Sequence, residues 1–214
     1  MHTHPLWRPY ETPSMEEINA ARLEVGAPAS VPVEVVAPDP DWPKWYESVS
    51  DRIRGALGER ALAIEHVGST AVLGLWAKPL IDVDLTVADS ADEDAWLPDL
   101  VAAGFVLRVR EPEWEEHRLV RGTDPDSNVH IFSLGAQESQ RVRMFRDWLR
   151  THPEDRDACS TTTRRHGSST TSTRRSSRPI PSMSTIHTHA RTSVGDRRSE
   201  RRPICATPCL CCTF

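Results

Sequence analysis

The chain has 214 residues and a formal net charge of −5 at pH 7, a length that suits one ordinary domain or two small ones. It contains no run of about 18 apolar residues, which excludes a membrane-spanning helix. Its first residues lack the basic and apolar segments of a secretory signal. We therefore expect a soluble, cytoplasmic protein that does not bind membranes.

The charge is divided unevenly along the chain. Residues 1–157 contain 16 Lys and Arg against 29 Asp and Glu (−13), and the remainder contains 10 Arg against 2 acidic residues (+8). All seven Trp lie in the first part and all five Cys in the second. The acidity of the first part argues against a nucleic-acid backbone as its main partner.

Residues 158–214 form a low-complexity tail that we expect to be disordered. Of these 57 residues, 21 are Ser or Thr and six are Leu, Ile, Val or Phe, too few to offset the entropy of ordering. The four cysteines from Cys205 to Cys212 have the spacing CxxxCxCC, which matches no paired zinc motif. The Arg, Ser and Thr repeats are also compatible with a nucleic-acid-binding arm.

A frameshift near Ala158 is the interpretation of the tail that we favour. The chain contains 24 Arg and only 2 Lys, the usage of a GC-rich coding sequence. GC-rich DNA translated out of frame yields Arg, Ser, Thr, Pro and Cys. On this hypothesis the original C-terminus has been replaced.

The hydrophobic pattern predicts a mixed sheet with packed helices in residues 31–157, after a partly ordered N-terminal extension of residues 1–30. The expected strands are 31–37, 61–67, 79–87, 105–110, 117–121 and 128–134. The expected helices are 43–57, a segment after Asp89 or Ser90 that carries Trp96, Leu97, Leu100 and Val101, and 138–149 with Val142, Phe145, Trp148 and Leu149 inward. We expect the last three strands to be antiparallel neighbours and the fold class to be α+β, or mixed α/β.

Two acidic residues stand out on the predicted strand 79–87. Asp82 and Asp84 are two apart, so their side chains lie on one face of the strand, about 6–7 Å apart at their Cα atoms. Such a pair can chelate one divalent cation or two neighbouring ones. A solvated edge strand is the alternative, but the apolar flanks in LIDVDLTV favour a site.

A Gly-Ser turn precedes this strand. Gly68 permits close approach of the backbone, and the hydroxyl of Ser69 together with free amides at a helix start can hold a phosphate. Twelve residues separate Ser69 from Asp82. The combination resembles the signature of the nucleotidyltransferase superfamily, in which the Gly-Ser turn positions a triphosphate and the DxD pair binds magnesium.

A longer segment is more specific. EHVGSTAVLGLWAKPLIDVDL, residues 65–85, closely resembles the hallmark of GrpB family proteins, EHxGSTAVPGLxAKPxIDI. The resemblance continues in APDPDWP, AAGFVLRVREPEWEEHRLVRG, NVHIFSLG and FRDWLRTHPEDRD, and covers roughly residues 15 to 157. It implies a nucleotidyltransferase-like fold and a relation to the domain that is fused to dephospho-CoA kinase in some actinobacteria. No kinase domain is expected here, because no GxxxxGK[ST] loop occurs.

The resemblance also implies a set of site residues. The catalytic residues would be Asp82, Asp84 and His130, and Asp82 and Asp84 would hold Mg²⁺. The phosphate- or nucleotide-binding residues would be Gly68, Ser69, Thr70, Lys78, His66, His117 and Arg118, around the same cleft. For each histidine, a structural role with a satisfied hydrogen bond is an equal alternative.

Three departures from known patterns bear on function. The strand NVHIFSL offers His130 where an active nucleotidyltransferase brings a third carboxylate, and Leu73 stands where the family has a proline. The long C-terminal helical segment of the family, with its tyrosine and basic residues, is not recognisable from Cys159 onward. We therefore expect an apolar face of the body to be uncovered.

Three functions remain open at this point. The first is transfer of a nucleoside monophosphate from an NTP to an unknown acceptor, assisted by Mg²⁺. The second is a non-catalytic module that binds a nucleotide or a phosphorylated metabolite, as an accessory to a partner enzyme. The third is a hydrolytic metal centre built from His66, His117, His130 and the two aspartates.

Overall fold

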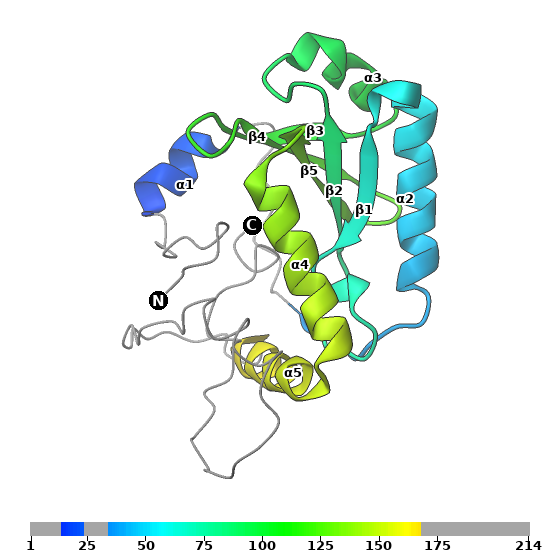
Figure 1. The fold of residues 1–214 in the computed structure, drawn as a ribbon, viewed down its shortest axis with the longest axis vertical. Coiled ribbons are helices and arrows are strands. Elements are labelled where there is room, and N and C mark those ends of the chain that lie inside the picture. The colour runs from blue at the N-terminus through cyan, green and yellow to red at the C-terminus, as the bar shows by residue number, and fades with distance from the viewer. Residues whose placement is uncertain (1–13, 24–33, 168–214) are drawn as a thin grey trace, which may run out of the picture.

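The computed structural model describes residues 14–23 and 34–167, and residues 1–13, 24–33 and 168–214 lie outside the described residues (Figure 1). The helices are α1 (Met15–Ala21), α2 (Trp42–Leu57), α3 (Leu97–Ala102), α4 (Gln137–Thr151) and α5 (Pro153–Gly167). The strands are β1 (Ala63–Val67), β2 (Ile81–Val87), β3 (Val106–Glu111), β4 (His117–Gly122) and β5 (Ser127–Ser133). Short 3-10 turns lie at η1 (Gly58–Arg60), η2 (Ser69–Ala71) and η3 (Glu93–Ala95).

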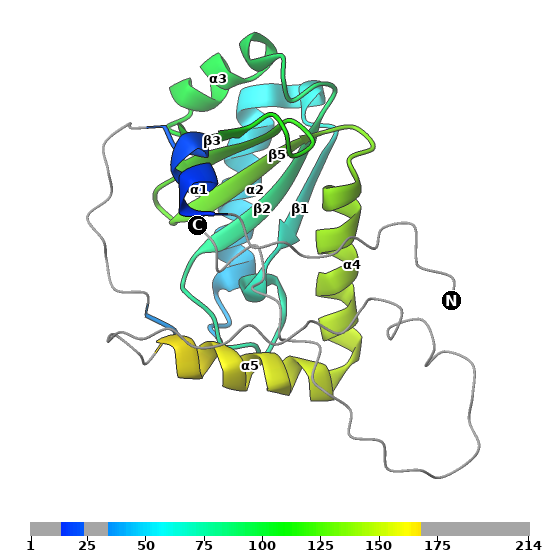
Figure 2. The same ribbon diagram turned by 90° about the vertical axis from the view of Figure 1, so that its left-hand side faces the viewer.

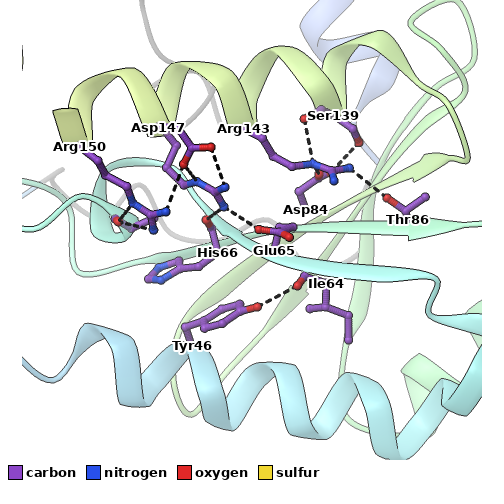
Figure 3. A network of polar contacts seen from close by, with 12 residues as sticks. Tyr46, Ile64, Glu65, His66, Asp84, Thr86, Ser139, Arg143, Asp147 and Arg150 are labelled. Atoms are coloured by element: carbon purple, nitrogen blue, oxygen red, sulfur yellow. Dashed lines mark hydrogen bonds and ion pairs between the residues drawn. The ribbon is translucent and has the colours of Figure 1, made fainter. Parts of the chain in front are cut away.

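The five strands form one sheet in the order β1-β2-β5-β4-β3. β2 and β5 are parallel, and all other neighbours are antiparallel. The predicted mixed sheet, the antiparallel arrangement of the last three strands and the α+β class are therefore confirmed. α2 and α4 lie on opposite faces of the sheet (Figure 3).

The main hydrophobic core lies between α2 and the sheet. Val49, Ile53 and Leu57 recur at helical spacing along α2 and are buried against alternate residues of β2 and β5. The strand residues in this core include Ile81, Val83, Leu85, Val129 and Ile131. Burial of each such side chain contributes about 1.5–3 kcal/mol, so this face holds the sheet and α2 together.

A second, smaller cluster joins α4 and α5 to the segment after η2. Val72, Leu75, Leu149 and Cys159 are buried together, with Phe145 and Trp148 packed against them. These residues come from α4, from α5 and from the loop that follows η2. The contact brings α4 and α5 next to the segment that follows the Gly-Ser turn (Figures 1 and 2).

α5 extends past residue 157, the predicted end of the folded domain. The helix continues to Gly167, the side chain of Ser160 is buried, and the Trp76 N–H donates to its Oγ over 3.4 Å. Glu154 and Asp155 lie in the first turn of α5, where carboxylates complement the helix dipole. The beginning of the expected tail is thus helical, and the rest of it lies outside the described residues.

Two predicted elements differ from the structure. Only Val36 of the expected strand 31–37 pairs, in a single bridge with Ala77, and residues 31–33 lie outside the described residues. The segment after Ser90 becomes helical only at η3 and α3, and Val101, one of the four apolar residues of this predicted helix, is 52% exposed. No helix in the described ranges combines the length and apolarity that crossing a membrane requires.

Candidate functional site

β2 is buried on both faces, and the two faces differ in chemistry. Asp82, Asp84 and Thr86 alternate with the apolar residues that pack on α2. In the sheet, Asp84 pairs with Glu65 of β1 and with His130 of β5, and Asp82 pairs with Asn128 of β5. We call Glu65, Asp82, Asp84, Asn128 and His130 the carboxylate face.

The Gly-Ser turn lies directly against this face. Gly68 has φ +72° and ψ −171°, a conformation open almost only to glycine. A Cβ added at Gly68 would lie 2.9 Å from the Cβ of Asp82 and still nearer to its carboxylate. The structure therefore brings Gly68 and Asp82 together, and Ser69 follows as the first residue of η2.

Asp84 is bound by two side chains of α4 (Figure 3). The Ser139 hydroxyl donates to Asp84 Oδ1 over 2.7 Å, and Arg143 Nε donates to Asp84 Oδ2 over 2.9 Å. Only 1% of Asp84 is exposed, and this burial raises the pKa of its carboxyl group, an effect that Ser139, Arg143 and His130 oppose. Asp84 thus has a guanidinium partner within the protein, but burial still has the larger effect on its pKa.

Two further arginines continue this contact along α4. Arg146 Nη1 donates to Glu65 Oε2 and to the His66 carbonyl, both over 2.8 Å. Arg150 donates to the Ala71 carbonyl from Nε and Nη2, over 3.2 and 3.0 Å. We call Arg143, Arg146 and Arg150 the arginine row. It connects α4 to β2, β1 and the turn η2.

The arginine row adds a polar part to the predicted inward face of α4, on which Phe145, Trp148 and Leu149 join the second cluster. Of the four residues expected inward, Leu149 is buried and the other three are half-buried. Towards its N-terminus, α4 faces the sheet with Ser139, Arg143 and Arg146 instead. These residues are spaced by four and three, as an apolar stripe would be. This helical spacing is the signal in the sequence that these residues share one face of α4. It identifies the inward face only when the carboxylates on the opposite strand are known.

A chain of titratable side chains leads from β3 to Asp82. Glu111 Oε2 lies 2.6 Å from His117 Nδ1, and His117 Nε2 lies 3.1 Å from His130 Nδ1. His130 Nε2 lies 3.8 Å from Asp82 Oδ1. Burial lowers the pKa of His117 to about 4, although the bond from Glu111 raises it. Glu111 is a member that the sequence analysis missed.

Other predicted site residues do not join the aspartates. The ring of His66 is stacked on Tyr46 of α2, and its Nε2 lies 3.1 Å from Thr70 Oγ1. Arg118 pairs in register with Ile131 and donates to Glu93 and Glu116. These three predicted residues, His66, Thr70 and Arg118, thus have structural partners elsewhere. Lys78 is half-buried before β2, and the described part of the chain shows no ion pair between it and either aspartate.

The pKa of His66 predicts a pH dependence of stability. Burial, with the charges of Arg150 and Arg146, lowers this pKa from 6.5 to about 4. The unfolded state therefore binds a proton in this range that the folded state does not. The free energy of unfolding should fall as the pH drops from 6.5 to 4, by at most about 1.4 kcal/mol per pH unit from this group.

Urea unfolding at several pH values checks this expectation. Between pH 6.5 and 4, the free energy of unfolding of His66→Asn should depend less on pH than that of the natural sequence. The difference corresponds to the uptake of at most one proton on unfolding. His117 should contribute to the pH dependence of both proteins, so the difference between their two profiles reports on His66 alone. Identical pH profiles would contradict the assignment.

Residues 32–176, more than half of the chain, match the family model described as GrpB protein. The chain is 48% identical to the UPF0157 protein BH1888 of Halalkalibacterium halodurans over 143 residues, 67% of this chain and 72% of the relative. It is 34% identical to a dephospho-CoA kinase of Mycolicibacterium paratuberculosis over 155 residues, 60% of this chain and 38% of that kinase.

A solved structure is also similar. The crystal structure of the conserved protein GrpB from Enterococcus faecalis matches with a TM-score of 0.56 and 28% sequence identity. The match covers 63% of this chain and 86% of that one. Together with the family model, it shows that this chain belongs to the GrpB family.

Proposed function

We propose that the protein binds a nucleotide or another phosphorylated small molecule, together with a divalent cation, at the Gly-Ser turn and the carboxylate face. The contact of Gly68 with Asp82 carries this proposal. It places backbone amides that suit a phosphate next to a carboxylate that suits a cation. A phosphate and its cation would then be bound at the same place.

The two carboxylates Asp82 and Asp84 are ligands of the type that a divalent cation takes. Asp82 has weaker partners than Asp84, namely Asn128 Nδ2 at 3.4 Å and His130 Nε2 at 3.8 Å. A cation would balance the charge of Asp82, with Asp84 as the second carboxylate. Mg²⁺ is the cation implied by the family resemblance, and when bound it would stabilise the charge of a phosphoryl group. Among the described residues, no group of three or more His, Cys, Asp or Glu is arranged as a metal site.

The arginine row would supply a second anchor for the ligand. The Arg143 side chain is 29% exposed, and its Nε is bonded to Asp84. When a cation engages Asp84, this guanidinium can turn to a phosphate oxygen, which it matches in geometry and charge. The relatives named dephospho-CoA kinase carry a matching segment within a longer chain, which supports an accessory role beside an enzyme.

Transfer of a nucleoside monophosphate is the second candidate. Glu65 favours it, because this residue pairs with Asp84 on the same face and supplies a third carboxylate from β1. The expected third position on β5 carries Asn128 and His130 instead. In this reaction the carboxylate face would hold the cations, and a hydroxyl or amine of the acceptor would attack the α-phosphate while pyrophosphate leaves.

Calorimetry with ATP, CTP, GTP and dephospho-coenzyme A, each with and without Mg²⁺, tests the proposal. We expect binding that Asp82→Asn weakens at least tenfold and that Asp51→Asn, on the exposed face of α2, leaves unchanged. Pyrophosphate release with an NTP would support transfer, and binding without release would support the accessory role. The absence of binding by all four ligands would overturn both.

A further inference from the structure

Both carboxylate oxygens of Asp84 are bonded to side chains of α4 (Figure 3). Ser139 Oγ donates to Oδ1 over 2.7 Å, and Arg143 Nε donates to Oδ2 over 2.9 Å. Arg143 Nη2 also donates to Thr86 Oγ1 over 3.4 Å. Asp84 and Ser139 are only 1% and 2% exposed. A ligand that binds at the carboxylate face can therefore reach the oxygens of Asp84 only when these two α4 side chains move away.

The two halves of α4 are attached to the protein by different forces. Residues 145–151 supply three apolar side chains to the second cluster. Residues 137–144 are attached by polar contacts, which are the bonds to Asp84 and a bond from the Glu138 N–H to a carboxylate oxygen of Glu115 over 3.2 Å. In the described part of the chain, no side chain of residues 137–144 belongs to either hydrophobic cluster.

Water can replace the polar contacts but not the apolar ones. A buried ion pair loses much of its Coulombic attraction to the dehydration of its two charges. If residues 137–144 separate from β2, Asp84 and Arg143 are both hydrated again, which offsets much of the lost attraction. Exposure of the apolar cluster has no such compensation and costs about 25 cal/mol per Å². The N-terminal half of α4 can therefore open while the C-terminal half stays in place.

The turn between β5 and α4 provides a hinge for this movement. Gly135 lies in this turn with φ +88°, and a Cβ added to it would meet nothing within 4 Å. A glycine in open space can change its backbone direction without steric conflict. Residues 137–144 thus have a hinge on one side and the anchored half of α4 on the other.

We propose that residues 137–144 form a cover that closes the carboxylate face by binding Asp84, and that the ligand binds the open form. This proposal rests on the proposed function, because it concerns access to the same site. The closed cover competes with the ligand for Asp84, so the apparent affinity is reduced to the fraction of molecules that are open. Weakening the closed form should therefore strengthen ligand binding, even though it lowers the stability of the fold.

Thiol labelling without ligand tests whether the cover opens by itself. Ser139→Cys and Ser50→Cys each place a thiol at a buried helical position, on α4 and on α2, and mass spectrometry of peptides separates these thiols from the other cysteines. We expect the thiol at position 139 to react at least about tenfold faster than the thiol at position 50. Low urea concentrations should leave its rate unchanged, because a local opening exposes little surface. Equal rates with the same urea dependence would overturn the proposal, since α4 would then open only when the whole protein unfolds.

Calorimetry with ATP and Mg²⁺ tests the competition for Asp84. Ser139→Ala removes one bond that closes the cover, and it should bind this probe about tenfold more tightly than the natural sequence does. Ser50→Ala is the matched control, because Ser50 is also a buried helical serine but its Oγ has no hydrogen-bond partner among the described residues. Its affinity should equal that of the natural sequence.

The outcomes separate this proposal from the proposed function. Equal or weaker binding by Ser139→Ala would overturn the cover and leave ligand binding at the carboxylate face intact. If none of the three proteins bound the probe while the thiol at position 139 reacted fast, the proposed function would be overturned and the opening of α4 supported.

Discussion

Replacing Gly68 by alanine is expected to destabilise the protein by about 2–5 kcal/mol and to displace the Gly-Ser turn from Asp82. The backbone at Gly68 has φ +72°, which strains a residue with a side chain. The added Cβ would also collide with the carboxylate and the Cβ of Asp82. Because Asp82 belongs to a strand that is buried on both faces, the turn and not the strand would have to move.

Urea unfolding of Gly68→Ala measures this effect, and Gly55→Ala is the matched control. Gly55 lies within α2, and a Cβ there would meet nothing within 4 Å. Alanine at this position should be neutral or stabilise the helix by up to about 1 kcal/mol. If the free energy of unfolding of Gly68→Ala lay within about 0.5 kcal/mol of the value for the natural sequence, the turn would not be held against Asp82 as described.

Replacing Arg143 by methionine is expected to destabilise the protein by about 3 kcal/mol at pH 7. The change leaves the carboxylate of Asp84 buried with the Ser139 hydrogen bond but without its guanidinium partner. The pKa of Asp84 is already raised by burial, and loss of Arg143 should raise it further. The folded state then binds a proton that the unfolded state, with a pKa near 3.8, has released.

The penalty should therefore depend on pH. A raised carboxyl pKa contributes stability at low pH that is lost as the pH rises through the folded-state value. The cost of Arg143→Met should be larger at pH 8 than at pH 5, and Asp84→Asn in the same chain should recover part of it. Arg54→Met, which removes an exposed ion pair with Asp51, should cost less than about 1 kcal/mol.

A double-mutant cycle measured by urea unfolding at pH 5 and pH 8 checks these expectations. It uses the natural sequence, the two single variants and the double variant. Equal penalties at both pH values, with no recovery in the double variant, would show that Arg143 stabilises the protein by packing and not through Asp84.

The sequence predicted the two faces of β2 because strand geometry leaves little freedom. Side chains alternate along a strand, so Asp82 and Asp84 had to share a face whatever packed on it. The neighbours of this face were harder to predict. Asn128 and His130 lie beside the aspartates through a parallel pairing of β2 with β5, whose register no local pattern determines.

Arginines on α4 escaped prediction for a different physical reason. Helix orientation was judged from apolar residues, which normally face a core. The sheet surface under α4 carries carboxylates, so Ser139, Arg143 and Arg146 provide the complementary face. When a helix packs on charged residues, its inward face carries residues of the opposite charge. This face can be recognised in the sequence only when the strand that it packs on is known.

Composition averaged over residues 158–214 does not reveal the helix that crosses residue 158. The first residues of that stretch continue a helix whose Cys159 and Ser160 are buried. The average composition of a long segment rich in Ser, Thr and Arg does not reveal two or three buried residues of this kind. Local packing of Cys159 against the loop after η2 stabilises this part of the helix.

The position of α4 in the chain has a consequence for synthesis on the ribosome. Ser139 and Arg143 lie 55 and 59 residues after Asp84. At about 5–20 residues per second, the aspartate emerges roughly 3–12 seconds before the side chains that neutralise it. Until then its charge requires water on one side of β2. β2 can therefore become fully buried only after α4 has been translated.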